Sequence, residues 1–225
     1  MAPVADWAEH FRREQERYSD GESRLPDAED ADARQRQLTR MGNAAAGAGL
    51  ALVMQGRTGG SREWFDRACE RYRESWRDAP PGSWGRPIGI LKARILAEDW
   101  DGAERDGKWT LEQGAGRAET SIGRYAAALA FAVLGDWDGA HIAAEALRLD
   151  ESFPSDVADA LAFIAAPDPV AYVEAVGSVL ESFETRDAYL EDLPAADTVL
   201  VLQALAERRG LVLAELESEL LPLAG

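Results

Sequence analysis

Apolar residues recur every three to four positions along most of the chain, a period typical of amphipathic α-helices. Few runs of β-branched residues interrupt it, so we predict an all-α fold. The pattern predicts ten helices, over residues 4–18, 33–55, 61–78, 84–97, 100–113, 118–134, 137–149, 155–164, 170–183 and 195–209.

Polar stretches with glycine and proline separate these helices. Residues 19–32 are acidic, and we expect a loop there, with Asp30 or Asp32 as the N-cap of the next helix. Ser61 and Ser155 are also expected N-caps. The breaks predict an N-terminal helix and acidic loop over residues 1–32 and one domain over residues 33–225.

Two of the predicted helices have unusual compositions. The middle of helix 33–55 consists mainly of Gly and Ala, which would let another helix approach closely. Helix 195–209 is apolar nearly all round, so we expect it to be buried in the centre. Gly210 is its expected stop, and the tail beyond it is expected to pack along this helix.

One segment occurs twice. Asp99–Ala103, with the sequence Asp-Trp-Asp-Gly-Ala, returns 37 residues later as Asp136–Ala140. A repeat of this period is typical of stacked helical hairpins. We expect the first Asp of each copy to cap the second helix of a hairpin, and Trp100 and Trp137 to pack between hairpins.

The second copy resembles the tetratricopeptide repeat (TPR) family. Ala128 and Phe131 precede Gly135-Asp136-Trp137 and Ala140, as a small residue and an aromatic precede the turn in that family. The resemblance implies antiparallel helical hairpins stacked as a TPR-like α-α superhelix. The earlier copy departs from the family pattern, since Leu91 and Arg94 stand at the two corresponding positions.

The net charge of −17 is distributed unevenly. Residues 150–225 contain 16 acidic and 3 basic residues, a net charge of −13. Nucleic acid is therefore disfavoured as a partner, because phosphate binding needs a basic surface. A basic protein would complement this third of the chain. A competing interpretation is that the acidity only solvates the protein, as in organisms that live at high salt.

The acidic third also contains the candidate binding residues. They are Glu174, Glu181, Glu184, Asp187, Glu191 and Asp192. Segments 166–175, 193–197, 202–210 and 218–222 resemble the C-terminal region of helical immunity proteins of bacterial polymorphic-toxin systems, immunity-protein family 49. The resemblance implies a protein without catalytic activity that binds and neutralises a toxin, here through its acidic surface.

Side chains for catalysis or metal binding are scarce. Cys69 lies among apolar residues and is expected in the core, while His10 and His141 stand far apart in the sequence, so we expect no metal site and no cofactor. The turn 56–61 lacks the Gly-Lys-Ser/Thr of a phosphate-binding loop.

No leader segment and no bilayer-length apolar stretch is visible, and we expect a cytoplasmic protein without membrane contact. The sequence thus favours a non-enzymatic protein-binding array. The alternatives are a structural or self-assembling helical module and an enzyme with an unrecognised pair of carboxylates.

Overall fold

The computed structural model describes residues 6–189 and 192–222, and this part of the chain is helical with no strand. The predicted all-α fold is therefore confirmed. The chain forms two compact units: described residues 6–97, 187–189, 192–195 and 217–222 belong to unit 1, and residues 98–186 and 196–216 to unit 2.

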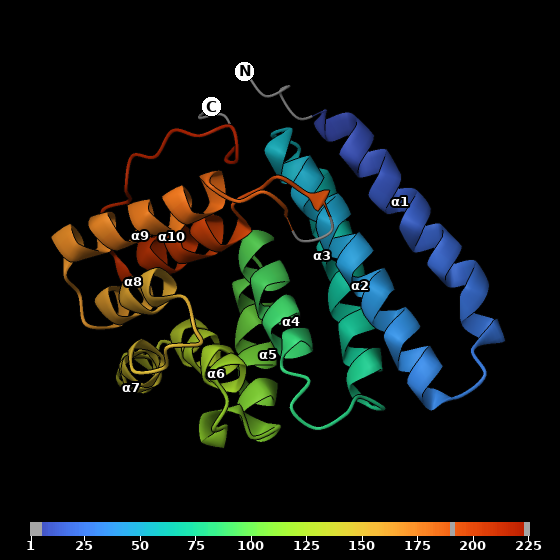
Figure 1. The fold of residues 1–225 in the computed structure, drawn as a ribbon, viewed down its shortest axis with the longest axis horizontal. Coiled ribbons are helices and arrows are strands. Elements are labelled where there is room, and N and C mark those ends of the chain that lie inside the picture. The colour runs from blue at the N-terminus through green and yellow to red at the C-terminus, as the bar shows by residue number, and fades with distance from the viewer. Residues whose placement is uncertain (1–5, 190–191, 223–225) are drawn as a thin grey trace. The chain divides into compact units, whose positions relative to one another are not determined.

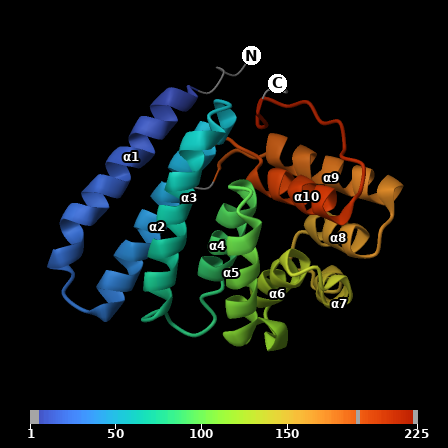
Figure 2. The same cartoon turned by 180° about the vertical axis from the view of Figure 1, so that it is seen from behind.

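Unit 1 contains four helices that pack in chain order. They are α1 (Trp7–Arg24), α2 (Ala31–Met54), α3 (Thr58–Trp76) and α4 (Gly85–Leu96), with a short 3-10 turn at Leu25–Asp27. Helices α1, α2 and α3 lie side by side from both viewing directions (Figures 1 and 2). Asp30 caps α2 as expected, since its carboxylate accepts a hydrogen bond from the amide of Ala33 at 2.7 Å.

The glycines of α2 bring α3 close, as the small-sided sequence predicts. A Cβ atom at Gly42 would lie 2.7 Å from the Tyr72 ring, and one at Gly49 would lie 2.8 Å from the Phe65 ring. Distances this short leave no room for a methyl group. The aromatic rings of α3 fill the surface that the missing side chains leave open, which compensates for the low helix propensity of glycine.

Two predicted boundaries in unit 1 are wrong. The predicted loop 19–32 is helical up to Arg24, because buried Gly21 packs against Met41 of α2 and Arg24 pairs with Asp20 one turn earlier at 2.9 Å. Helix α3 starts at Thr58, three residues before the predicted cap Ser61. The Arg57 carbonyl accepts from the amide of Ser61 at 3.3 Å, so the helix is already formed there.

Unit 2 contains the remaining six helices. They are α5 (Trp100–Glu112), α6 (Ser121–Val133), α7 (Trp137–Arg148), α8 (Ser155–Ala165), α9 (Pro169–Glu184) and α10 (Asp197–Arg209), with a 3-10 turn at Ala115–Arg117. Each of α5 to α9 packs against the next, and α10 contacts α8 and α9. The expected cap Ser155 is instead the first helical residue and makes no capping bond.

The duplicated segment builds the same helix start twice. Asp99 accepts from the amide of Gly102 and Asp136 from that of Gly139, both at 3.0 Å, so both predicted caps are confirmed. The residue before each cap has a left-handed backbone, with φ of 53° at Glu98 and 72° at Gly135. The repeat is thus a repeat of local geometry, even where its residues differ.

Helix α10 is buried on most sides, as its sequence predicts, and Gly210 ends it with φ of 84°. The following tail is extended. It runs back along α10, where the Gln203 side-chain amide donates to the carbonyl of Ala214 at 2.9 Å. The apolar composition of α10 is therefore explained by α8, α9 and the tail, which cover it together.

Candidate protein-binding face of helix α9

Helix α9 contains three of the six predicted binding residues. Its start is well defined, because Pro169 occupies the first turn and Asp168 accepts from the amide of Ala171 at 3.1 Å. One side of the helix is buried against α8 and α10. The buried residues are Tyr172, Ala175, Val176, Val179, Leu180 and Phe183.

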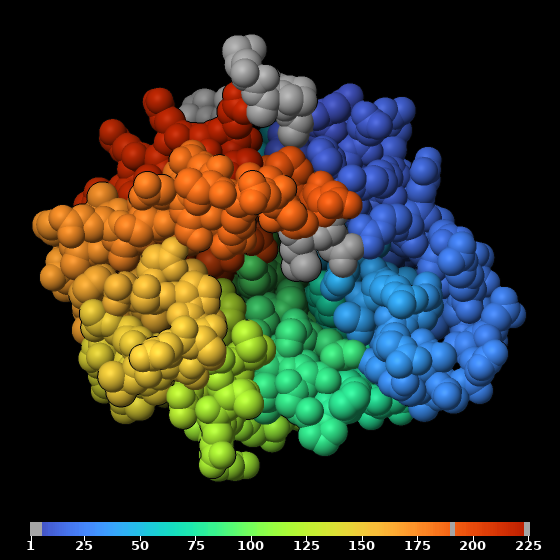
Figure 3. Space-filling view, in the orientation of Figure 1, coloured from blue at the N-terminus to red at the C-terminus, as the bar shows by residue number. Residues whose placement is uncertain are grey.

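The opposite side of α9 forms a continuous exposed stripe. Val170 is 72% exposed and Val173 43% exposed, which is unusual for valine in a helix that has an apolar core beside it. Glu174, Ser178 and Glu181 continue the stripe at helical spacing. We call these five residues, together with Gly177 and Glu184, the α9 face. All of its residues except the half-buried Gly177 are exposed, and α9 forms part of the orange surface in Figure 3.

The position of Val173 corrects one detail of the helical pattern. Helical spacing alone would group Val173 with Val176, Leu180 and Phe183 on one apolar side, but Tyr172 is buried in the structure and Val173 is not. Tyr172 is fully buried and fills the space against the neighbouring helices. Val173 therefore lies on the exposed stripe, next to Glu174.

Two glutamates of the α9 face, Glu174 and Glu181, have no basic partner in the described chain. The helix contains three glutamates and no basic residue. Among the described residues, no basic side chain pairs with Glu174 or Glu181. The next basic residue along the chain, Arg186, places its guanidinium 3.7 Å from the centre of the Phe183 ring. The face thus combines exposed apolar groups with two carboxylates, those of Glu174 and Glu181, that have no basic partner among the described residues.

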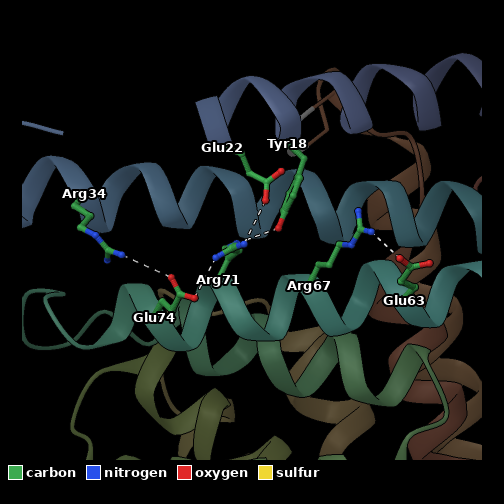
Figure 4. A network of polar contacts seen from close by, with 7 residues as sticks. All are labelled: Tyr18, Glu22, Arg34, Glu63, Arg67, Arg71 and Glu74. Atoms are coloured by element: carbon green, nitrogen blue, oxygen red, sulfur yellow. Dashed lines mark hydrogen bonds and ion pairs between the residues drawn. The ribbon is translucent and has the colours of Figure 1, made fainter. Parts of the chain in front are cut away.

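Helix α3 of unit 1 shows the opposite arrangement. It contains four arginines and four acidic residues, and several of them pair with one another or with residues of α1 and α2 (Figure 4). Arg71 donates to the Tyr18 hydroxyl at 3.0 Å and pairs with Glu74 at 3.1 Å and Glu22 at 3.4 Å. Three of its four acidic residues, Glu63, Asp66 and Glu74, therefore pair with arginine. Glu174 and Glu181 of α9 have no such partner among the described residues.

The other predicted binding residues belong elsewhere. Asp187 and Asp192 are exposed and are part of unit 1, where the Asp192 carbonyl accepts from Arg13 at 3.3 Å. Glu191 lies outside the described residues. The candidate site is accordingly described on α9 alone, through Glu174, Glu181 and Glu184.

Exposed apolar side chains also mark unit 2. Among the described residues, every large apolar side chain that is strongly exposed belongs to this unit; they are Ile122, Ile142, Leu149, Val170, Val173, Val212 and Leu213. Near the exposed Ile142 of α7 and Leu149 at its C-terminal end, Arg148 binds Glu145 at 2.8 Å and Asp159 at 2.6 Å. Beside Val170 and Val173 of α9, Glu174 and Glu181 have no basic partner among the described residues.

Two arginines of α10 cover the tryptophans of the repeat. The guanidinium of Arg208 lies 4.5 Å from the centre of the Trp100 ring, and that of Arg209 lies 4.8 Å from Trp137. Both tryptophans are half-buried. The sequence did not predict these two arginine–tryptophan contacts. The only hint of them in the sequence is the adjacent pair Arg208 and Arg209 before Gly210.

The residues that carry reactive chemistry occupy structural positions. Cys69 is buried, and its thiol points to the carbonyl of Ile90 at 3.7 Å, as expected of a core residue. Burial lowers the pKa of His10 below its usual value. Within residues 6–189 and 192–222, no three His, Cys, Asp or Glu side chains gather into a group that could hold a metal ion.

Comparison with known proteins leaves the fold and the face to be interpreted on their own geometry. No family model, curated protein or solved structure matches the chain. None of the described helices has the length and apolar character needed to span a bilayer.

Proposed function

We propose that this chain is a non-enzymatic protein that binds another protein through the α9 face, and that its partner presents a basic surface with an apolar spot. The observation that carries the proposal is the combination, on one exposed stripe, of Val170 and Val173 with the unpaired Glu174 and Glu181. Exposed apolar groups beside like charges are unfavourable in a free protein and favourable in a complementary interface.

A toxin neutralised by this protein is the partner class that we favour. The sequence resemblance to immunity proteins includes residues 166–175, which contain the first part of α9. A basic toxin, such as a nuclease, would complement the three glutamates of a helix that has no basic residue. On this proposal the TPR-like array of hairpins is the scaffold that presents α9.

The test compares two charge reversals of equal size. Glu174→Lys with Glu181→Lys changes the α9 face, and Glu9→Lys with Glu16→Lys makes the same change on α1, where both glutamates are exposed and also seven residues apart. Tagged wild-type protein is expressed in its native host, the co-purifying protein is identified, and the purified pair is measured by calorimetry.

We expect the α9 reversal to weaken the purified pair at least about tenfold and the α1 reversal to have little effect. The wild-type affinity should also fall when ionic strength rises from about 0.05 M to about 0.5 M. Equal losses in the two reversals, or binding that ignores both salt and the α9 reversal, would contradict the proposal. Marked stabilisation of the free protein by molar salt, without any specific partner, would favour acidity that serves only solvation.

A further inference from the structure

Gly177 differs from the glycines that pack closely in the interiors of α2, α4 and α5. A Cβ atom at Gly107 would lie 2.8 Å from Val133, and one at Gly42 or Gly49 would meet an aromatic ring equally closely. A Cβ atom at Gly177 would meet nothing within 4 Å. Packing inside the described chain therefore explains the buried glycines and gives no reason for a glycine at this position.

A glycine in the middle of a helix weakens the helix relative to alanine. Gly177 lies in the interior of α9, a helix of 16 residues, with a backbone in the ordinary helical region. Neither a turn nor a close neighbour requires glycine here. The missing side chain does leave a gap in the exposed stripe, between Val173 and Glu174 on one side and Glu181 on the other.

We propose that an α-helix of the partner protein crosses α9 at Gly177. This inference rests on the proposed function and adds the form of the partner. A residue without a side chain at the crossing point lets two helices approach closely. An apolar residue of the partner would then contact Val170 and Val173, and a lysine or arginine would pair with Glu181.

The backbone of α9 favours a helix over an added strand. Strand addition needs free backbone N–H and C=O groups along an edge. In α9 these groups are bonded within the helix, so only its side chains and the gap at Gly177 can be recognised. A crossing helix satisfies its own backbone in the same way and offers a row of side chains to the α9 face.

The charges of the face exclude a second copy of the chain as the preferred occupant. Two α9 helices crossing at Gly177 would bring Glu174 and Glu181 of each close to those of the other. Like charges placed opposite each other across an interface are repulsive. A basic amphipathic helix is complementary to the same residues, and we therefore commit to it.

The test uses two variants of Gly177 and a defined probe. The probe is a constrained helical peptide of about 18 residues, with leucines followed by lysines on one side, and its control has glutamates in place of the lysines. Gly177→Ala and Gly177→Leu are compared with Ser23→Leu, which adds a leucine to the exposed side of α1 in unit 1. Binding is measured by fluorescence anisotropy and folding by thermal unfolding.

We expect Gly177→Ala to raise the melting temperature by about 2–4 °C, because alanine favours the helix and no neighbour obstructs it. The same variant should bind the basic peptide about fivefold more weakly, and Gly177→Leu about twentyfold more weakly. Ser23→Leu should bind like the wild type. A gain in stability together with a loss of binding cannot arise from damage to the fold.

Three results would overturn the inference. One is wild-type protein that does not prefer the basic peptide over the acidic one. Another is equal binding of the basic peptide by wild type and Gly177→Leu. If the double variant Glu174→Lys with Glu181→Lys still weakens binding in that case, the proposed function stands and only the crossing at Gly177 is refuted. The third is a wild-type dimer in sedimentation that Gly177→Leu converts to a monomer, which would assign the face to a second copy.

Discussion

Substitution of Arg208 tests which contacts attach α10 to α5 and α6 within unit 2. Its guanidinium donates to Glu104 of α5 at 2.6 Å and to the carbonyl of Val133, the last residue of α6, at 3.2 Å. It also lies over the Trp100 ring. The adjacent Arg209 only covers Trp137, and its buried Nε has no hydrogen-bond partner among the described residues.

The magnitudes follow from these contacts. A partly exposed ion pair contributes about 0.5–1 kcal/mol, a hydrogen bond to a carbonyl about 1 kcal/mol, and a cation–π contact at the surface about 0.5–1 kcal/mol. Arg208→Ala should therefore lower the free energy of unfolding by about 2–3 kcal/mol. Arg209→Ala loses only the ring contact and should cost about 1 kcal/mol or less.

Urea unfolding followed by circular dichroism at the helix band measures both variants. A double-mutant cycle with Glu104→Ala separates the ion pair from the remaining contacts of Arg208. We expect coupling between Arg208 and Glu104 and none between Arg209 and Glu104. If the two arginine variants lose equal stability, the reasoning that ranks them by their partners is refuted.

Three further predictions concern single groups. Tyr172→Phe should stabilise the protein by about 1 kcal/mol in thermal melts, because the buried hydroxyl has no partner in the described chain. As a matched control, Tyr72→Phe removes a hydrogen bond to Asn43 at 2.9 Å and should destabilise the protein in the same melts. Burial raises the pKa of Tyr172 to about 12, so the unfolded state loses this proton first and stability should fall between about pH 10 and pH 12; Tyr172→Phe should remove that part of the loss. Glu98→Gly relieves a left-handed backbone and should raise stability by up to about 1 kcal/mol, whereas Gly135→Ala, at the equivalent position, should lower it; a loss of stability in Glu98→Gly would contradict this.

Local rules account for most of the predicted elements. The caps at Asp30, Asp99 and Asp136 are confirmed. Each Asp accepts a hydrogen bond from the backbone amide three residues later, so the sequence around it is enough to predict the cap. The start of α3 at Thr58 was not predicted, because no side chain caps it. Its first bonds are accepted by the backbone of Arg57, and a backbone carbonyl carries no sequence signal.

The charge asymmetry and the duplicated segment are properties of the sequence alone. They predict an acidic third and two equivalent turns, and the turns are confirmed in the geometry of Asp99 and Asp136. Composition could not show that Glu63, Asp66 and Glu74 of α3 pair with arginine. Nor could it show that Glu174 and Glu181 of α9 have no basic partner among the described residues. Pairing depends on which arginines the folded chain brings within reach.

The sequence by itself thus determined the sign of the charge, which composition gives directly, and where most helices lie. It also determined the caps at Asp30, Asp99 and Asp136, because a cap depends on neighbours within one turn. Only the tertiary structure decided which side of α9 is buried. Tyr172 and Val173 are both apolar enough for a core, yet only Tyr172 is buried. The tertiary structure also decided that Gly177 faces open space whereas Gly42 faces a ring. The physical reason is that burial is a property of the surrounding helices, which the chain assembles from distant residues.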